Sequence, residues 1–179
     1  PDGGVARLRV YGEVVPDWQR LVSLKELDLA AIEHGGLVLE ASDMFFGSRH
    51  NLILPGRARN MGDGWETKRR RGPGHDWAVV KLGTAGTVHR VEVDTSHFKG
   101  NYPESCSLDA CRMEGAAPAD LSSTPWQELL PRTKLEADTR HNFEGELKPL
   151  GPVTHVRLNI YPDGGVARLR VFGKLAEMK

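Results

Sequence analysis

The 179-residue chain is close to the length of one ordinary domain, and its formal charge is zero because 24 basic side chains balance 24 acidic ones. With 39% hydrophobic residues it can bury a core without a disulfide or a metal. The balanced charge gives no reason to expect nucleic acid or an anionic membrane as a partner, and no apolar run approaches the ~20 residues that span a bilayer.

Two nearly identical segments mark the ends of the chain. Residues 1–12 read PDGGVARLRVYG and residues 162–173 read PDGGVARLRVFG, so eleven of twelve positions match at an offset of 161 residues. This spacing indicates a duplicated domain. We expect residues 1–12 to be the last strand of a preceding truncated repeat, residues 13–27 a linker, and residues 28–179 one complete repeat. Whether residues 1–12 pack onto that repeat stays open.

The first helix signal follows the linker. Residues 28–36 read DLAAIEHGG, which predicts one or two helical turns from Asp28 as N-cap to Gly35 as the stop. A second signal lies at residues 124–127, where TPWQ resembles a capping box with proline at the first helical position. It predicts a short helix that ends at Pro131.

Period-two alternation predicts strands at residues 5–10, 35–41, 76–82, 88–94 and 154–161. In residues 88–94, His89 shares a face with Val91 and Val93, so we expect it to lie in the core. Short strands separated by Gly/Pro loops, with one or two short helices, favour an all-β antiparallel sandwich or jelly roll. In such folds function lies on the loops at one end of the sheets.

One loop is rich in glycine and cations. Residues 60–77 read NMGDGWETKRRRGPGHDW, and residues 49–81 hold eight cations against three acids. Arginine forks pair with carboxylates or phosphates, and glycines allow close backbone approach, so a small anionic ligand is one interpretation. A solvated surface run is another for KRRR alone. A nucleic-acid site is the third, which the few aromatic residues, 7%, disfavour.

A second polar segment follows the strand at residues 88–94. Residues 93–103 read VDTSHFKGNYP, and on an extended chain Thr95, His97 and Lys99 share a face. A histidine beyond a strand end and beside a cation suits general acid or base catalysis, although a loop histidine that bonds backbone has the same pattern. Cys106 and Cys111 are spaced C-x4-C, which allows a disulfide but fits two buried thiols better.

Several long motifs resemble the allantoicase family. They are ASDMFFGSRHNLILPGRARNMGDGWETKRRRGPGHDWAVVKLG (41–83), VEVDTSHFKGNYPESCSLDAC (91–111), LLPRTKLEADTRHNF (129–143) and THVRLNIYPDGGVARLRVFG (154–173). The resemblance covers nearly the whole chain from about residue 28. It implies two repeated jelly rolls similar to galactose-binding-like modules, in agreement with the duplication. It also implies hydrolysis of allantoate to ureidoglycolate and urea in purine (allantoin) degradation.

The chemistry of allantoate, a carboxylate on a carbon with two ureido groups, suggests roles for the polar segments. We expect His97 and Glu66 to act as acid and base. We expect Arg57, Arg59 and Lys99 to bind the carboxylate of allantoate. We expect Asn60 and Asp63 to bind its ureido groups.

Other properties are expected as follows. We expect a cytoplasmic homo-oligomer with no cofactor and no metal, since no spacing of Asp, Glu or His dictates a metal site. The chain begins with Pro1 and shows no signal peptide, which indicates a fragment or a processed product. The alternative functions are a non-catalytic ligand-binding jelly roll and an inactive truncated half of the enzyme.

Overall fold

Most of the regular secondary structure of the described residues is β-strand. The computed structural model describes residues 2–12, 14–21, 23–24, 26–113 and 124–176. The helix is α1 (Trp18–Leu21), and the short 3-10 turns are η1 (Ile32–His34), η2 (Arg49–Ile53) and η3 (Met61–Asp63). The strands are β1 (Leu27–Asp28), β2 (Leu37–Ala41), β3 (Trp65–Glu66), β4 (Asp76–Asp94), β5 (Ser105–Cys111), β6 (Gln127–Lys134), β7 (Arg140–Phe143), β8 (Val153–Tyr161), β9 (Gly165–Val166) and β10 (Arg168–Leu175).

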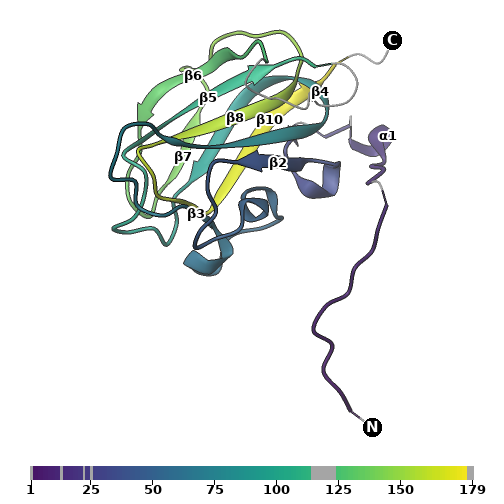
Figure 1. The fold of residues 1–179 in the computed structure, drawn as a ribbon. Coiled ribbons are helices and arrows are strands. Elements are labelled where there is room, and N and C mark those ends of the chain that lie inside the picture. The colour runs from purple at the N-terminus through teal and green to yellow at the C-terminus, as the bar shows by residue number, and fades with distance from the viewer. Residues whose placement is uncertain (1, 13, 22, 25, 114–123, 177–179) are drawn as a thin grey trace.

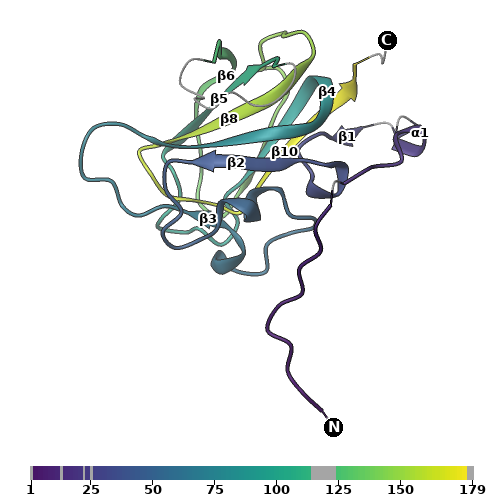
Figure 2. The ribbon, with the colours of Figure 1, turned by 45° about the vertical axis from the view of Figure 1, so that its right-hand side comes forward.

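The 19-residue strand β4 runs through both layers of one eight-stranded antiparallel sheet, and β3 pairs with β9 in a separate two-stranded sheet. Its first half, residues 76–81, pairs with β2 and β8, and β8 continues through β5 to β6. Its second half, residues 86–94, pairs with β7 and β10, and β10 pairs with β1. Two antiparallel layers that share a long strand form the predicted all-β jelly-roll sandwich (Figures 1 and 2).

The core lies between the two layers. Val80 and Leu158 from the first layer, together with Val91 and Leu169 from the second, are fully buried in one apolar cluster. Each such side chain contributes about 1.5–3 kcal/mol when it leaves water. The alternation predicted for residues 154–161 is confirmed, because the aliphatic side chains of β8 face this core. Its polar side chains face away, where Asn159 donates to Asp109 of β5.

The one or two helical turns predicted at residues 28–36 are confirmed in part, because one turn forms and Asp28 is not its N-cap. These residues hold the end of β1 and the single turn η1, although Gly35 does stop the turn, with a φ of 89°. Asp28 caps no helix, since its Oδ1 accepts the N–H groups of Ala30 at 3.1 Å and Val171 at 3.0 Å. The second bond ties β1 to β10, and this non-local pairing outweighs the weak propensity of a short isolated helix.

The helix predicted to end at Pro131 is wrong, because residues 127–134 form strand β6. Leu129 and Leu130 are buried, and β6 pairs with β5 from Gln127 to Lys134 with register shifts. Since β6 is the outermost strand of its sheet, Pro131 removes no hydrogen bond that a central strand would need.

His89 does not lie in the core, contrary to the expectation. The register of β4 against β10 skips this position, with Val88 opposite Gly173 and Arg90 opposite Phe172. The extra residue turns the side chain outward, where it is 42% exposed and its Nε2 lies 3.2 Å from Oε1 of Glu26.

Cys106 and Cys111 are free and buried, so the interpretation as two thiols is confirmed. An odd sequence offset places the two side chains on opposite faces of β5, where no disulfide between them is possible. Burial raises the pKa of Cys106 to about 12 and that of Cys111 to about 11, which keeps both thiols protonated.

Residues 2–12 extend away from the sandwich in both views (Figures 1 and 2). All of them are exposed and none belongs to a strand. Their copy, residues 163–173, runs through β9 and β10 with Leu169 fully buried. Pro1 and residues 177–179, which complete the predicted repeat boundaries, lie outside the described residues. Within the described ranges no helix is long and apolar enough to cross a membrane.

Candidate functional site

An open cavity of about 750 Å³ lies among the loops that follow β3, β4, β6 and β8. We call it the loop cavity. Its polar and aromatic walls include Phe46, Glu66, Arg69, Arg70, Asn101, Tyr102, Glu104, Lys134 and Asp163. This is the loop end of the sandwich, where a rigid scaffold presents variable side chains and where such folds carry their ligand sites.

Backbone hydrogen bonds join the segments around the loop cavity. The N–H of Thr67 donates to the carbonyl of Gly164 at 3.1 Å, and the N–H of Gly165 donates to the carbonyl of Asn101 at 2.8 Å. The N–H of Leu135 donates to the carbonyl of Glu104 at 3.0 Å. Four segments that are distant in the sequence therefore hold one another in a fixed frame.

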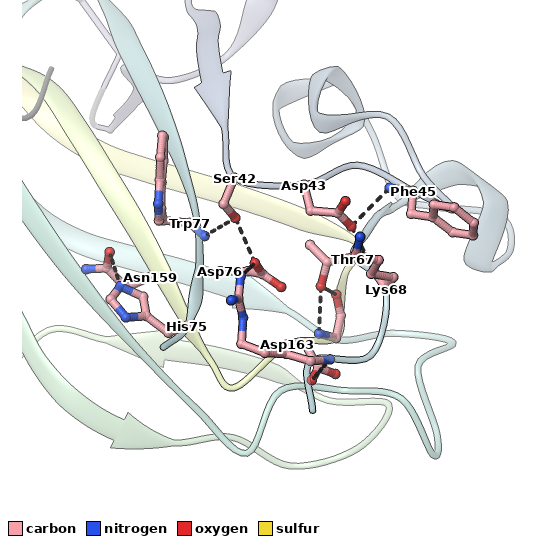
Figure 3. A network of polar contacts seen from close by, with 12 residues as sticks. Ser42, Asp43, Phe45, Thr67, Lys68, His75, Asp76, Trp77, Asn159 and Asp163 are labelled. Atoms are coloured by element: carbon pink, nitrogen blue, oxygen red, sulfur yellow. Dashed lines mark hydrogen bonds and ion pairs between the residues drawn. The ribbon is translucent and has the colours of Figure 1, made fainter. Parts of the chain in front are cut away.

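Arg70 is the structural cation of the KRRR run. Its Nη2 donates to Oδ1 of the buried Asp76 at 2.5 Å, and the same oxygen accepts from Ser42 Oγ at 2.9 Å. The backbone N–H of Arg70 donates to Oδ2 of Asp163 at 2.7 Å. Figure 3 labels Ser42, Asp76 and Asp163 of this network. The network fixes the segment after β3 against the end of β2 and the β8–β9 turn.

Asp43 anchors the beginning of the same run. Its Oδ2 accepts the N–H of Lys68 at 2.8 Å, and its carbonyl accepts Nε1–H of the buried Trp65 at 2.8 Å. The side chains of Lys68, Arg69 and Arg71, by contrast, have no hydrogen-bond or ion-pair partner within the described ranges. In the KRRR run, therefore, Arg70 has a structural role, and the other three cations are open to a ligand or to water.

Glu66 enters the loop cavity from the end of β3. Its Oε1 accepts a hydrogen bond from Asn101 Nδ2, and the side chain is half-buried. Phe98 supports this arrangement, because its fully buried ring packs against the backbone of Gly64 and Gly165. A carboxylate that is hydrogen-bonded to an amide suits a general base that is held in one orientation.

His97 joins two loops beside the loop cavity. It has a φ of 72°, and its backbone N–H donates to Oδ1 of Asp138 at 2.7 Å. Its Nε2 lies 3.0 Å from the carbonyl oxygen of Ala58, so Nε2 carries the proton and donates. Nδ1 is then the nitrogen available to act as a base when the imidazole is neutral.

Arg59 and Asp63 form an ion pair at the surface. Nε of Arg59 donates to Oδ2 of Asp63 at 2.9 Å, and its backbone N–H donates to the same oxygen at 3.0 Å. These bonds lower the pKa of Asp63 to about 2. Asn60 precedes η3, and its carbonyl accepts the N–H of Asp63 at 3.2 Å.

The two remaining candidates also lie outside the cavity wall. Lys99 is mostly exposed, and its Nζ lies 3.9 Å from Oδ2 of Asp138. Arg57 lines a separate hollow of about 330 Å³ together with Arg168 and Arg170. Of the seven candidate residues, Glu66 lines the loop cavity, and five lie on the adjoining loops at residues 59–63 and 97–99. The catalytic and binding roles of all seven stay predictions.

Several cavity residues were not among the sequence candidates. Asn101 stands in the polar segment 93–103 and could have been selected as an amide near a strand end. Lys134 and Asp163 gave no local signal, because only pairing of β6 with β5 and the turn after β8 bring them here. Within the described ranges no three or more His, Cys, Asp or Glu side chains gather as a metal site requires.

Comparison with known proteins identifies the family. Residues 27–176 match the Allantoicase repeat family. The chain belongs to the allantoicase family. It is 58% identical over 175 residues to a protein named "Probable allantoicase" from Pseudomonas aeruginosa, and that match covers 97% of this chain and 53% of the relative.

Solved structures agree with this assignment. Saccharomyces cerevisiae allantoicase superposes with a TM-score of 0.79 at 43% identity over 97% of this chain and 49% of the yeast chain. The chain thus spans about half the length of the allantoicases that it matches. A family 32 carbohydrate-binding module from C. perfringens, at 13% identity and a TM-score of 0.59 over 82% of this chain, shares the fold alone. The galactose-binding-like fold expected for an allantoicase repeat is therefore confirmed.

Proposed function

We propose that this chain carries a site for the hydrolysis of allantoate to ureidoglycolate and urea, as part of purine (allantoin) degradation. The observation that carries the proposal is the Glu66–Asn101 pair in a polar cavity of a chain from the allantoicase family. The reaction class is hydrolysis of a C–N bond in a linear ureide. Because the chain spans about half of its relatives, whole-enzyme activity is part of the proposal.

The reaction needs one acid and one base. The bond between the central carbon and one ureido nitrogen breaks, and that nitrogen takes a proton as urea departs. Water supplies the oxygen of the new C–O bond, and its second proton passes to the base. We assign Glu66 and His97 to these proton transfers, each of which typically contributes about 100- to 10,000-fold to the rate.

Glu66 is the better placed of the two residues to act as the base. It lines the loop cavity, and its second carboxylate oxygen has no partner within the described ranges. His97 lies on the adjoining loop, with Nε2–H engaged by the carbonyl of Ala58. It reaches substrate only through Nδ1. Asn60 and Asp63, proposed to contact the ureido groups of the substrate, lie on the other loop that adjoins the cavity.

Urea release from allantoate tests the proposal directly. We expect Glu66→Gln to lower the rate at least about 100-fold and His97→Asn to lower it by a similar factor if both transfer protons. Arg71→Gln is the matched control, because it changes an exposed cation that lies outside the cavity wall. Wild-type rates in both variants would contradict these roles while leaving allantoate hydrolysis in place.

The second candidate is a ligand-binding jelly roll without turnover, either a separate module or an inactive half of the enzyme. The observation that favours this candidate is that the chain matches only about half the length of its allantoicase relatives. It predicts that allantoate raises the melting temperature through binding to the folded state, with no urea released.

We also propose that the protein is a cytoplasmic homo-oligomer that binds no nucleic acid or membrane. Residues 1–12 are proposed to be the last strand of a preceding repeat. Size-exclusion chromatography with light scattering measures the oligomeric state, and a monomer would contradict that part.

A further inference from the structure

The loop cavity presents two kinds of polar group. One kind is cationic, at Arg69 and Lys134, whose side chains make no hydrogen bond or ion pair within the described ranges. The other is the hydrogen-bonded pair of Glu66 and Asn101, whose Oε2 and Oδ1 accept nothing there. We infer that the cavity binds an α-ureido carboxylate with its carboxylate on Arg69 and Lys134 and its ureido group on Glu66 and Asn101. This inference rests on the proposed function and adds the orientation of the substrate and the residues that select it.

Arg69 is the guanidinium that remains available in the cavity. Arg70 is committed to the buried Asp76. Nearby, Arg132 donates to Glu104 at 3.0 Å and stacks over the Tyr161 ring. Since Arg69 has no such tie, its planar fork can pair with both oxygens of a carboxylate.

The sequence candidates for carboxylate binding are less available. Nε and the backbone N–H of Arg59 both serve Asp63, and Arg57 lines a different hollow. Lys99 lies close to Asp138. Arg69 and Lys134 are therefore the cations that the cavity itself presents.

The acids of the cavity have hydrogen-bond partners in the protein. Glu104 accepts from Ser105 Oγ and from Arg132, bonds that, with the nearby charge of Lys134, hold its pKa below the ordinary value. Asp163 accepts the backbone N–H of Arg70. Glu66 is hydrogen-bonded to the side-chain amide of Asn101, and its Oε2 accepts nothing within the described ranges.

The Glu66–Asn101 pair complements a ureido group. The carboxylate of Glu66 is an acceptor, so the amide nitrogen of Asn101 must point to it and the amide oxygen must point elsewhere. This leaves Glu66 Oε2 and Asn101 Oδ1 as acceptors, and a ureido group presents N–H donors on adjacent nitrogens. The cavity thus pairs cations with an anion and acceptors with donors.

The frame that carries these groups is rigid. Thr67 and Leu135, each next to one of the ligand-binding residues, are tied by backbone bonds to Gly164 and Glu104. Pre-organised groups lose little freedom on binding, so each contact contributes more to affinity.

Three small molecules separate the two halves of the site. Hydantoate carries one carboxylate and one ureido group, ethylurea only the ureido group, and propionate only the carboxylate. Isothermal titration calorimetry on the whole chain measures their dissociation constants. We expect Arg69→Gln to weaken hydantoate roughly tenfold or more, Lys134→Gln to weaken it less, and ethylurea to be unaffected by either.

Variants outside the cavity provide the controls. Arg71→Gln neighbours Arg69 in sequence but does not line the cavity, so hydantoate should bind it as it binds wild type. Unchanged hydantoate affinity in Arg69→Gln would overturn the inference, and so would a loss confined to Arg57→Gln, Arg59→Gln or Lys99→Gln. Absence of hydantoate binding to wild type at about 10 mM would overturn it as well.

Failure of this substrate orientation and failure of the proposed hydrolase activity give different results. Arg69-dependent hydantoate binding without urea release from allantoate supports the site but contradicts the hydrolase. Urea release that is unaffected by Arg69→Gln and Lys134→Gln supports the hydrolase but overturns this orientation of the substrate.

Discussion

At the scale of single residues, Asp76 decides how firmly the cationic run is held. It is 1% exposed and accepts from both Arg70 and Ser42. We expect Asp76→Ala to lower the free energy of unfolding by about 2 kcal/mol, because both donors lose a buried acceptor while Arg70 regains some water. Urea denaturation measures the change. Arg71→Ala, as the control, should stay within about 0.5 kcal/mol of wild type, and equal values for the two variants would contradict this role.

His155 predicts a pH dependence of stability. It is 2% exposed, burial lowers its pKa from 6.5 to about 4, and its Nε2 has no hydrogen-bond partner within the described ranges. Since the unfolded chain binds the proton at a higher pH, stability falls as the pH drops through 6.5 toward 4. We expect a loss of about 2 kcal/mol between pH 7 and pH 5.

The control for this pH effect is His155→Gln, which cannot titrate. Urea denaturation at the two pH values should show a smaller loss for the variant than for wild type. An identical loss in both proteins would assign the pH dependence to other groups.

The residue scale also shows where sequence reasoning stops. The glycine-rich loop was recognisable as a candidate binding segment, and Glu66 from it does line the cavity. The sequence did not show which cation of KRRR has a structural role. Arg70 has that role because it bonds to Asp76 and to Asp163, which lies 93 residues away in the chain. Alternation and local charge carry no information about such partners.

At the scale of elements, the Phe98 ring packs tightly against strand β9. A Cβ at Gly165 would lie 2.0 Å from the Phe98 ring, and this ring holds the loop that carries Asn101. We expect Gly165→Ala to cost about 1–3 kcal/mol through overpacking, and to weaken hydantoate binding if Asn101 shifts with the ring. Gly151→Ala is the matched control, since nothing lies within 4 Å of its added Cβ. Equal stability of the two variants, measured by urea denaturation, would contradict the tight contact.

The elements that sequence predicted well are those whose alternation is unbroken. Residues 154–161 form β8 with the expected faces, whereas the register skip at His89 inverts one position of β4. Residues 76–82 and 88–94 were expected as two strands and form one. Gly83 and Gly86 lie in this strand where an added Cβ would meet the backbone oxygens of His34 and Lys174. The helix predicted to end at Pro131 failed because pairing with β5, which the local sequence does not show, outweighs a short capping motif. The helix predicted at residues 28–36 is reduced to the single turn η1, since Asp28 instead bonds to β10.

At the scale of the whole molecule, the fold class followed from strand spacing, and the family followed from long motifs. The spacing of strands along the sequence does not show which loops meet at one end of the sandwich. That depends on which strands pair with β4 in each of the two layers. The duplicated segment adds a comparison that few chains offer. The same residues stand once outside the sandwich and once inside it, at residues 5–10 and 166–171.

The two copies predict unequal effects for an equal change. Leu8 is 86% exposed and Leu169 is fully buried, although both stand in the sequence VARLRV. We expect Leu169→Ala to lower the free energy of unfolding by about 2–5 kcal/mol and Leu8→Ala to stay within about 0.5 kcal/mol of wild type. Urea denaturation of this chain measures both. If residues 1–12 are the last strand of a preceding repeat, a longer chain that carries that repeat should lose a similar 2–5 kcal/mol on Leu8→Ala, because the side chain then fills the equivalent core position. A neutral Leu8→Ala in the longer chain would contradict the assignment of residues 1–12, and a neutral Leu169→Ala would contradict the buried position of β10 itself.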